Sequence, residues 1–245
     1  MSSSLPLTQH RTAAPPPEAR PSFFYDLGDA ESWLAAERVN AALPVVPEWV
    51  PVDRRGLGGR RGAHAGDEGG RGADADAGGA DAPLGRDAIE ALARERGLQP
   101  LRWPATWPPE GRAALLAATY AKQTGRAVAF SLAAFRQALA GGRDLADADT
   151  VLLAGAACEL HPSALLRALE LAATAKALDA ATAAAARAGV RRVPAVRVGA
   201  EVFHGDGGID AAAAALADDG GTANGGAAGG GAADGGAADG GEVAS

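Results

Sequence analysis

Cysteine is nearly absent from this chain, which holds only Cys158 among its 245 residues. A single cysteine excludes an intramolecular disulfide and any redox cycle of the Cys-x-x-Cys type. It also fits a reducing compartment, and the polar, proline-rich residues 1–21 lack the apolar core of a signal peptide. We therefore expect a cytoplasmic protein in which Cys158 is a buried, small apolar side chain.

Long apolar runs and excess positive charge are also missing. No stretch of about 18 uncharged apolar residues occurs, so the sequence predicts no membrane span. The formal net charge of −7 argues against a nucleic-acid partner. Aromatic residues make up only 4% of the chain, so much of its core must be built from Ala, Leu and Val. No metal site is predicted.

Three segments have compositions that do not support a packed core. Residues 1–21 are rich in Pro, residues 54–83 in Gly, Ala, Arg and Asp, and residues 218–245 in Gly, Ala and Asp. Such segments bury too little apolar surface to offset their ordering entropy, so we predict a disordered leader, a flexible linker and a disordered tail. The Arg and Gly residues of the linker faintly suggest RNA binding, but nearby acidic residues nearly cancel their charge. One folded domain over 22–217 remains.

The domain begins with a strand over 22–26, because its aromatic residues favour β structure. A turn at Gly28 leads into a helix. Asp29 occupies the N-cap position, where its carboxylate can accept an otherwise unpaired backbone N–H. The start of such a helix also stabilises negative charge, which suits a thiolate, a phosphate or a carboxylate. The apolar face of the helix carries Trp33, Leu34, Val39 and Leu43.

Prolines and glycines divide the next part of the chain into short elements. A strand is predicted over 45–52, where an internal proline, Pro47, favours a sheet edge or a bulge. A helix over 87–96 ends at Gly97. The Pro-locked segment that follows is expected to pack its two tryptophans, Trp103 and Trp107, against the core; stacking on a ligand is the alternative.

Four or five helices are predicted between residues 110 and 188. A helix over 151–160 is expected to contain Cys158, and the His161 that follows it is expected to be a surface residue that ends this helix. Glycine, proline and a change of pattern mark the breaks, which lie near Gly125, Gly141-Gly142, His161-Pro162 and Leu171.

The last part of the domain contains two short strands and a helix. The strands are predicted over 195–198 and 201–203, joined by a glycine turn, and the helix over 209–216. Val193-Pro194 leads into the first strand. We expect this bond to be cis, which is essentially confined to proline; a trans proline that begins a strand is the alternative.

Three of these segments resemble the DsbA-like thioredoxin superfamily, in particular its branch of 2-hydroxychromene-2-carboxylate isomerases and kappa-class glutathione transferases. They are the first strand and helix, Gly97-Leu-Gln-Pro-Leu-Arg-Trp-Pro104, and Gly189-Val-Arg-Arg-Val-Pro194 with the strands after it. The resemblance implies an α/β, thioredoxin-like fold: a β-α-β unit, a helical insertion over 84–172, and a β-β-α unit. Without the resemblance, the pattern indicates only an α/β domain with a helix-rich middle.

The resemblance also implies a site where the first helix begins. Family members have Ser or Cys at the first position of the tetrapeptide that is Asp29-Ala-Glu-Ser32 here. Asp29 is therefore a candidate general base or ligand-positioning residue in place of a group that activates sulfur, since an ionised aspartate donates no hydrogen bond and opposes a nearby thiolate. Its alternative role is a simple N-cap. Ser32 keeps the family's second position and can bond a ligand or its own backbone.

The same resemblance implies that the loop before Pro194 binds an extended ligand. The backbone of Val193 is expected to pair with it, as a strand pairs with a sheet edge. In the family, an Asp after the last strands receives the glutamyl amino group of glutathione. That position falls on Gly207, and the adjacent Asp206 is the candidate to replace it.

Two functions follow from the resemblance. The first is an isomerase or glutathione-transferase-like enzyme, an oxidoreductase by fold only, that acts on a small aromatic or electrophilic molecule with glutathione or a related thiol. The second is a non-catalytic descendant that binds a peptide, a small acid or a partner protein in the cis-proline groove. Dithiol oxidoreduction is a poor third, because neither cysteine of that motif exists. The frequent dimerisation of the family suggests a homodimer.

Overall fold

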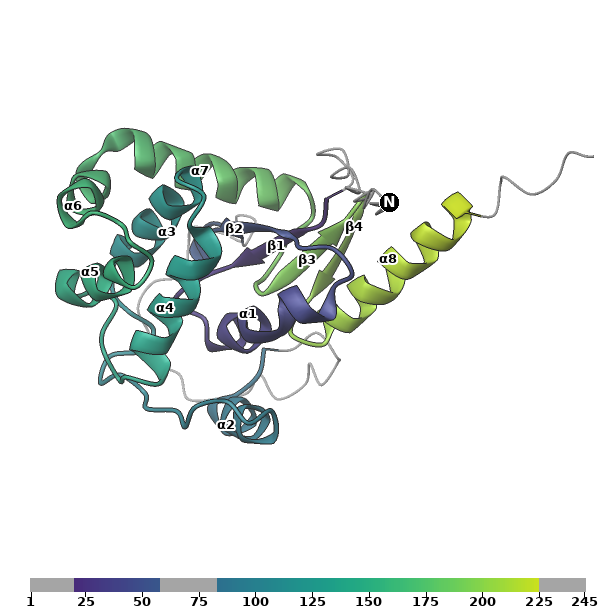
Figure 1. The fold of residues 1–245 in the computed structure, drawn as a ribbon, viewed down its shortest axis with the longest axis horizontal. Helices are drawn as coiled ribbons and strands as arrows, with labels where there is room; N and C mark the ends of the chain where they lie inside the picture. Colours follow the sequence, from purple (N-terminus) through teal and green to yellow (C-terminus); the bar gives the residue numbers. More distant parts are fainter. Residues whose placement is uncertain (1–19, 58–82, 225–245) are drawn as a thin grey trace, which may run out of the picture.

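The computed structural model of the chain describes residues 20–57 and 83–224. The described residues form a β-α-β unit, a helical insertion and a β-β-α unit (Figure 1), which confirms the predicted α/β, thioredoxin-like fold. Most of the leader, residues 58–82 of the linker and the tail from residue 225 lie outside the described residues. The thioredoxin elements are β1 (Ser22–Tyr25), α1 (Ala30–Ala42), β2 (Glu48–Pro51), β3 (Ala195–Val198), β4 (Glu201–His204) and α8 (Gly208–Asn224).

The four strands form one sheet in the order β2-β1-β3-β4. β1 is parallel to β2, with Phe23 opposite Trp49, and antiparallel to β3, with Phe23 opposite Val196. β3 is antiparallel to β4. β2 is an edge strand, which agrees with the prediction drawn from Pro47. It is shorter than the predicted 45–52, however, because pairing begins at Glu48 and Pro47 precedes it.

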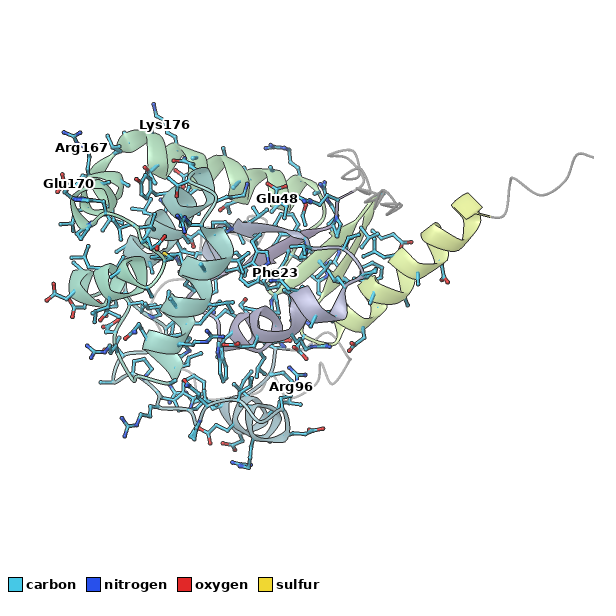
Figure 2. All side chains as sticks on the ribbon, in the orientation of Figure 1. Phe23, Glu48, Arg96, Arg167, Glu170 and Lys176 are labelled. Atoms are coloured by element: carbon cyan, nitrogen blue, oxygen red, sulfur yellow. The ribbon has the colours of Figure 1, made fainter. Side chains whose placement is uncertain are left out.

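Alternation along β1 places side chains on both faces of the sheet. Phe23 and Tyr25 belong to the larger core layer, which includes α1, α8 and the insertion, whereas Phe24 packs on the opposite face with residues of α7. The rings of Phe23 and Trp49 meet edge to face at 5.0 Å between centroids. Figure 2 shows Phe23 in the interior, while the charged side chains labelled on α6 and α7 point outward.

The insertion and the helix that returns from it contain six helices. They are α2 (Arg86–Glu95), α3 (Ala113–Gln123), α4 (Ala127–Leu139), α5 (Ala148–Ala156), α6 (Pro162–Glu170) and α7 (Ala172–Arg187). The breaks lie where glycine, proline and Leu171 were predicted to place them. None of the helices in the described ranges combines the length and the apolar character that a membrane crossing requires.

Two details near α5 correct the sequence analysis. α5 ends at Ala156, so Cys158 lies in the turn after the helix rather than within it. Its side chain is 4% exposed, as expected for a buried small residue. His161 does not end a helix: it is the N-cap of α6, whose first residue is Pro162. This order is favourable because proline lacks only an N–H that the first helical turn leaves unpaired.

Two boundaries of the predicted disordered segments are also wrong. Arg54–Gly56 form a short 3₁₀ helix, η2, whose N-cap Asp53 accepts the Arg55 N–H. Contact with α7 holds this turn, because the Thr182 hydroxyl accepts the Asp53 N–H at 3.0 Å. At the other end, α8 continues to Asn224, beyond the predicted end at 216. Its many alanines favour helix, which outweighs the glycines that suggested a tail.

Candidate functional site

A cleft lies between the start of α1 and the loop that precedes β3. It has a volume of about 320 Å³ and brings together segments that are far apart in the sequence. Asp29 contributes from the start of α1 and Val193 from the loop, as the resemblance implied. The other lining residues are Arg54, Arg55, Pro83, Arg191 and Arg192.

Asp29 is both the N-cap of α1 and a wall of this cleft. Its Oδ2 accepts the Ser32 N–H at 2.7 Å, the bond expected of an N-cap carboxylate. The pKa of Asp29 is raised to about 6: burial is the main cause, hydrogen bonds from Ser32 oppose the rise, and the negative charges of Glu31 and Asp26 add to it. With this pKa, about a tenth of the Asp29 carboxyl is protonated at pH 7. It can therefore donate as well as accept a proton, which the sequence analysis did not allow.

Ser32 contacts Asp29 from the interior of the protein and does not line the cleft. Its side chain has no exposed surface. The hydroxyl accepts the Asp26 N–H at 3.4 Å and helps to hold the pKa of Asp29 down. In this arrangement Ser32 acts through Asp29 rather than by touching a ligand.

The Val193-Pro194 loop forms the opposite wall. The bond between these residues is cis, and the Pro194 carbonyl accepts the Gly205 N–H at 2.8 Å. Within the described ranges, neither backbone group of Val193 makes a hydrogen bond to another backbone group. The Nε2 atom of His204 accepts the Arg191 N–H at 3.1 Å, so the imidazole holds this loop in place.

Asp206 lies outside the cleft lining and is engaged by arginines. It is 5% exposed. One carboxylate oxygen accepts from Arg38 at 3.2 Å and from Arg96 at 2.9 Å, and the other accepts from Arg96 as well. The Asp206 N–H donates to Glu31 at 2.9 Å. The predicted ligand-binding carboxylate is thus committed to an internal ion-pair network.

Glu31 connects this network to the cleft, a role that the sequence analysis missed. It is 5% exposed, and its carboxylate accepts from the Asp206 N–H and from Arg192, the latter at 3.4 Å. Gly205 makes room for this approach: its φ is +78°, and a Cβ there would lie 2.6 Å from an Arg192 nitrogen. An acidic residue in a first helical turn is ordinary, so no local pattern predicts this contact.

The four arginines of the cleft come in two adjacent pairs. Arg54 and Arg55 follow β2, and Arg191 and Arg192 precede the cis peptide bond. Arg55 binds the carboxylate of Asp53 at 2.9 and 3.0 Å. Arg54 and Arg55 lie in the segment predicted to be a flexible linker, and this prediction is wrong for them. For Arg191 and Arg192, the sign in the sequence is their position directly before Val193.

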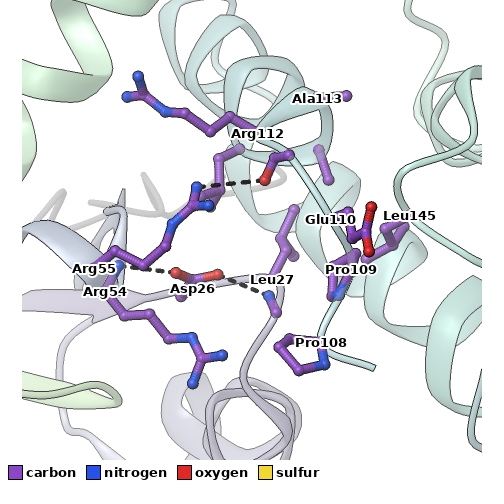
Figure 3. Close-up of a pocket in the computed structure, with 14 residues that line it drawn as sticks. Asp26, Leu27, Arg54, Arg55, Pro108, Pro109, Glu110, Arg112, Ala113 and Leu145 are labelled. Carbon is purple, nitrogen blue, oxygen red and sulfur yellow. Dashed lines mark hydrogen bonds between the residues drawn. The ribbon is translucent and has the colours of Figure 1, made fainter. Parts of the chain in front are cut away.

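A second, smaller cavity of about 90 Å³ lies beside the turn between β1 and α1. Figure 3 shows Asp26 at its wall, where the carboxylate accepts the Gly28 N–H at 2.7 Å and the Arg54 N–H at 2.9 Å. Burial raises the pKa of Asp26, and these bonds oppose the rise. Asp26 therefore fixes the backbone from which Arg54 reaches the main cleft. No cluster of three or more metal-ligating side chains exists in the part of the chain that is described.

Comparison with known proteins places this geometry in context. A family model of the DSBA-like thioredoxin domain matches residues 86–217. A solved 2-hydroxychromene-2-carboxylate isomerase superposes with a TM-score of 0.64 at 18% identity, over 83% of this chain and 98% of that one. A probable DsbA oxidoreductase from Streptomyces coelicolor gives 0.60 at 18% identity, over 82% and 90%. No protein of curated function matches the sequence. At these identities the structural likeness bears on the fold alone.

Proposed function

The chain belongs to the DSBA-like thioredoxin domain family, and from this premise we propose that it binds a small carboxylate-bearing molecule in the Asp29 cleft and transfers a proton through Asp29. Glutathione or a related thiol is the proposed ligand or co-substrate, and the reaction is of the isomerase or transferase type. One observation carries the proposal: a carboxyl with a pKa of about 6 lines a cleft that also holds four arginines.

The pKa of Asp29 supports proton transfer. A general acid or base works best when its pKa lies near the operating pH, because both of its protonation states are then accessible. In an isomerisation, Asp29 takes a proton from one ligand atom and returns it to another. Such a cycle consumes no oxidant and no second substrate. It fits a family member in which no pair of cysteines exists.

The walls of the cleft support a carboxylate-bearing ligand. Guanidinium groups bind carboxylates with two parallel hydrogen bonds, and glutathione carries two carboxylates. On the opposite wall, the unpaired backbone of Val193 supports pairing with a peptide-like segment of the ligand. Thiol activation receives no such support, since the negative charge of ionised Asp29 opposes a thiolate beside it.

A non-catalytic binding protein is the second candidate, and a specific observation favours it. Two side chains that the resemblance offers for ligand contact, Ser32 and the Asp206 proposed for the glutamyl amino group of glutathione, are both withdrawn from the cleft. Ser32 is fully buried, and Asp206 is committed to Arg38 and Arg96. A groove with these groups withdrawn can still hold a small acid or a peptide without acting on it.

Calorimetric titration with reduced glutathione and with S-methyl glutathione tests the proposal. We expect both to bind with micromolar to low millimolar affinity, the S-methyl form more tightly because it cannot place a thiolate beside Asp29. Absence of heat with either ligand would argue against the glutathione hypothesis.

A screen of aromatic carboxylates and electrophiles first identifies a ligand and a reaction. The substitution Asp29→Asn then distinguishes the enzyme from the non-catalytic binding protein. This change should keep the fold and binding but abolish turnover. Asp147→Asn is a matched control, because Asp147 is also an N-cap, but an exposed one at the start of α5. Binding without turnover in the unmodified protein would favour the non-catalytic candidate.

A further inference from the structure

The two arginine pairs of the cleft share one arrangement. In each pair, one guanidinium is already bound by a carboxylate of the protein. Asp53 binds Arg55, and the buried Glu31 binds Arg192. These two arginines are neutralised, and their positions are set by the fold.

The second member of each pair has no such partner. Within the described ranges, the side chains of Arg54 and Arg191 make no hydrogen bond or ion pair. Both residues are exposed, yet their backbones are anchored. The Arg54 N–H donates to the buried Asp26, and the Arg191 N–H donates to His204. The backbone of each arginine is therefore fixed beside the cleft, and its guanidinium group lines the cleft and is available to a ligand.

The balance of charge among the described residues leaves two guanidinium groups at the cleft without an ion-pair partner, and the nearby negative charges that act on them are Asp29 in the cleft lining and the buried Asp26 behind Arg54. This local cluster of positive charge occurs in a chain whose formal net charge is −7. General attraction of anions to the whole protein therefore does not account for it. The volume of about 320 Å³ lies at the lower end of the range for small-molecule sites, so the ligand is compact.

We propose that this cleft selects a compact dicarboxylate, with one carboxylate on Arg54, the other on Arg191, and the reacting part of the molecule between them against Asp29. The assignment rests on the proposed function and adds the substrate class. A dicarboxylate matches the arrangement because the two arginines come from different segments of the chain. A phosphate monoester places both of its charges on one group and cannot engage both walls in the same way.

Calorimetry with four simple probes tests this inference: phthalate, benzoate, phenyl phosphate and reduced glutathione. We expect phthalate to bind at least about tenfold more tightly than benzoate, because it gains a second charge-assisted contact. Phenyl phosphate is expected to bind more weakly than phthalate. Equal or tighter binding of phenyl phosphate would overturn the two-point arrangement.

Substitutions of the two unpaired arginines test whether each of them contacts the bound dicarboxylate. Arg54→Gln and Arg191→Gln should each weaken phthalate binding by about ten- to a hundredfold and bring it close to that of benzoate. Arg167→Gln is the matched control, because Arg167 is exposed on the outer side of α6 (Figure 2). This substitution removes the same charge and should leave the affinity for phthalate unaltered. Circular dichroism melts verify that each variant is folded.

The outcomes separate this inference from the proposed function. Equal binding of phthalate and benzoate, together with binding of glutathione, would overturn the dicarboxylate preference and leave the proposed function standing. Unaltered phthalate affinity in both cleft variants would also overturn the inference. Absence of binding by every probe would overturn both.

Discussion

Replacement of Asp29 by asparagine is expected to stabilise the protein at neutral pH, although N-cap substitutions usually destabilise. Asparagine caps helices as well as aspartate does, so the bond to the Ser32 N–H can remain. What disappears is the cost of ionising a buried carboxyl. The pKa of Asp29 rises from the ordinary 3.8 to about 6 in the folded protein. A shift of about two units corresponds to at most about 3 kcal/mol, and partial exposure reduces this to roughly 1–3 kcal/mol.

The pH dependence of this effect has a defined sign. Because the folded pKa of Asp29 is the higher one, the folded state binds the proton more tightly than the unfolded state. The wild-type protein therefore loses stability relative to Asp29→Asn as the pH rises from about 4 to about 6, and the difference is constant above that window. The charged groups that face Asp29 are Asp26 from the end of β1, Glu31 from α1, Arg54 and Arg55 from η2, and Arg191 and Arg192 from the cis-proline loop.

Urea unfolding at pH 4, 5, 6, 7 and 8 measures the effect. At pH 4 we expect Asp29→Asn and wild type to be nearly equally stable, and at pH 8 the variant to be more stable by roughly 1–3 kcal/mol. The exposed N-cap control, Asp147→Asn, should show no such gain. A variant that is less stable than wild type at pH 8 would refute the reasoning. It would mean that Asp29 is an ordinary ionised cap whose charge the helix dipole favours.

Two further substitutions and one labelling experiment test the buried polar groups and the cysteine. Glu31→Gln should lower the free energy of unfolding by about 2 kcal/mol or more, because it leaves Arg192 facing a neutral group; a urea curve shifted by less than about 0.5 kcal/mol would contradict this. Tyr25→Phe removes the 2.6 Å hydrogen bond to Ser131 and should cost about 1–2 kcal/mol in the same assay. Burial raises the pKa of the Cys158 thiol, so a thiol-specific reagent should label native protein far more slowly than unfolded protein; equally fast labelling would show that Cys158 is accessible.

Local sequence patterns predicted the framework of the fold because they reflect constraints that act over a few residues. The run of aromatic residues from Ser22 to Tyr25 favours a strand whatever surrounds it. Gly125 adopts a φ of +74°, which glycine tolerates and other residues rarely adopt. Signals of this kind mark the ends of the insertion helices and do not depend on tertiary contacts.

Tertiary contacts decided the features that the sequence did not predict. Arg54–Gly56 read as linker, yet Asp26 and Thr182, which are distant in sequence, bind the backbone there and order it. The commitment of Asp206 to Arg38 and Arg96 likewise spans 168 and 110 residues. Hydrogen bonds over such separations leave no local pattern. The family resemblance predicted that Asp29 and Val193 lie in the same site, but it did not predict which charged side chains surround them.

Under the proposed function, the negative charge of Asp29 and the positive charges of the two unpaired arginines depend on each other. An ionised Asp29 alone would repel an anionic ligand, and unpaired arginines alone would bind anions without any group to act on them. Together, under the proposed function, they are linked: a bound carboxylate near Asp29 favours the protonated carboxyl, and protonation of Asp29 in turn favours the bound carboxylate. The Asp29 pKa of about 6 would then rise toward neutrality in the complex. Both protonation states of Asp29 would then be well populated near pH 7, which is what the proposed proton cycle needs.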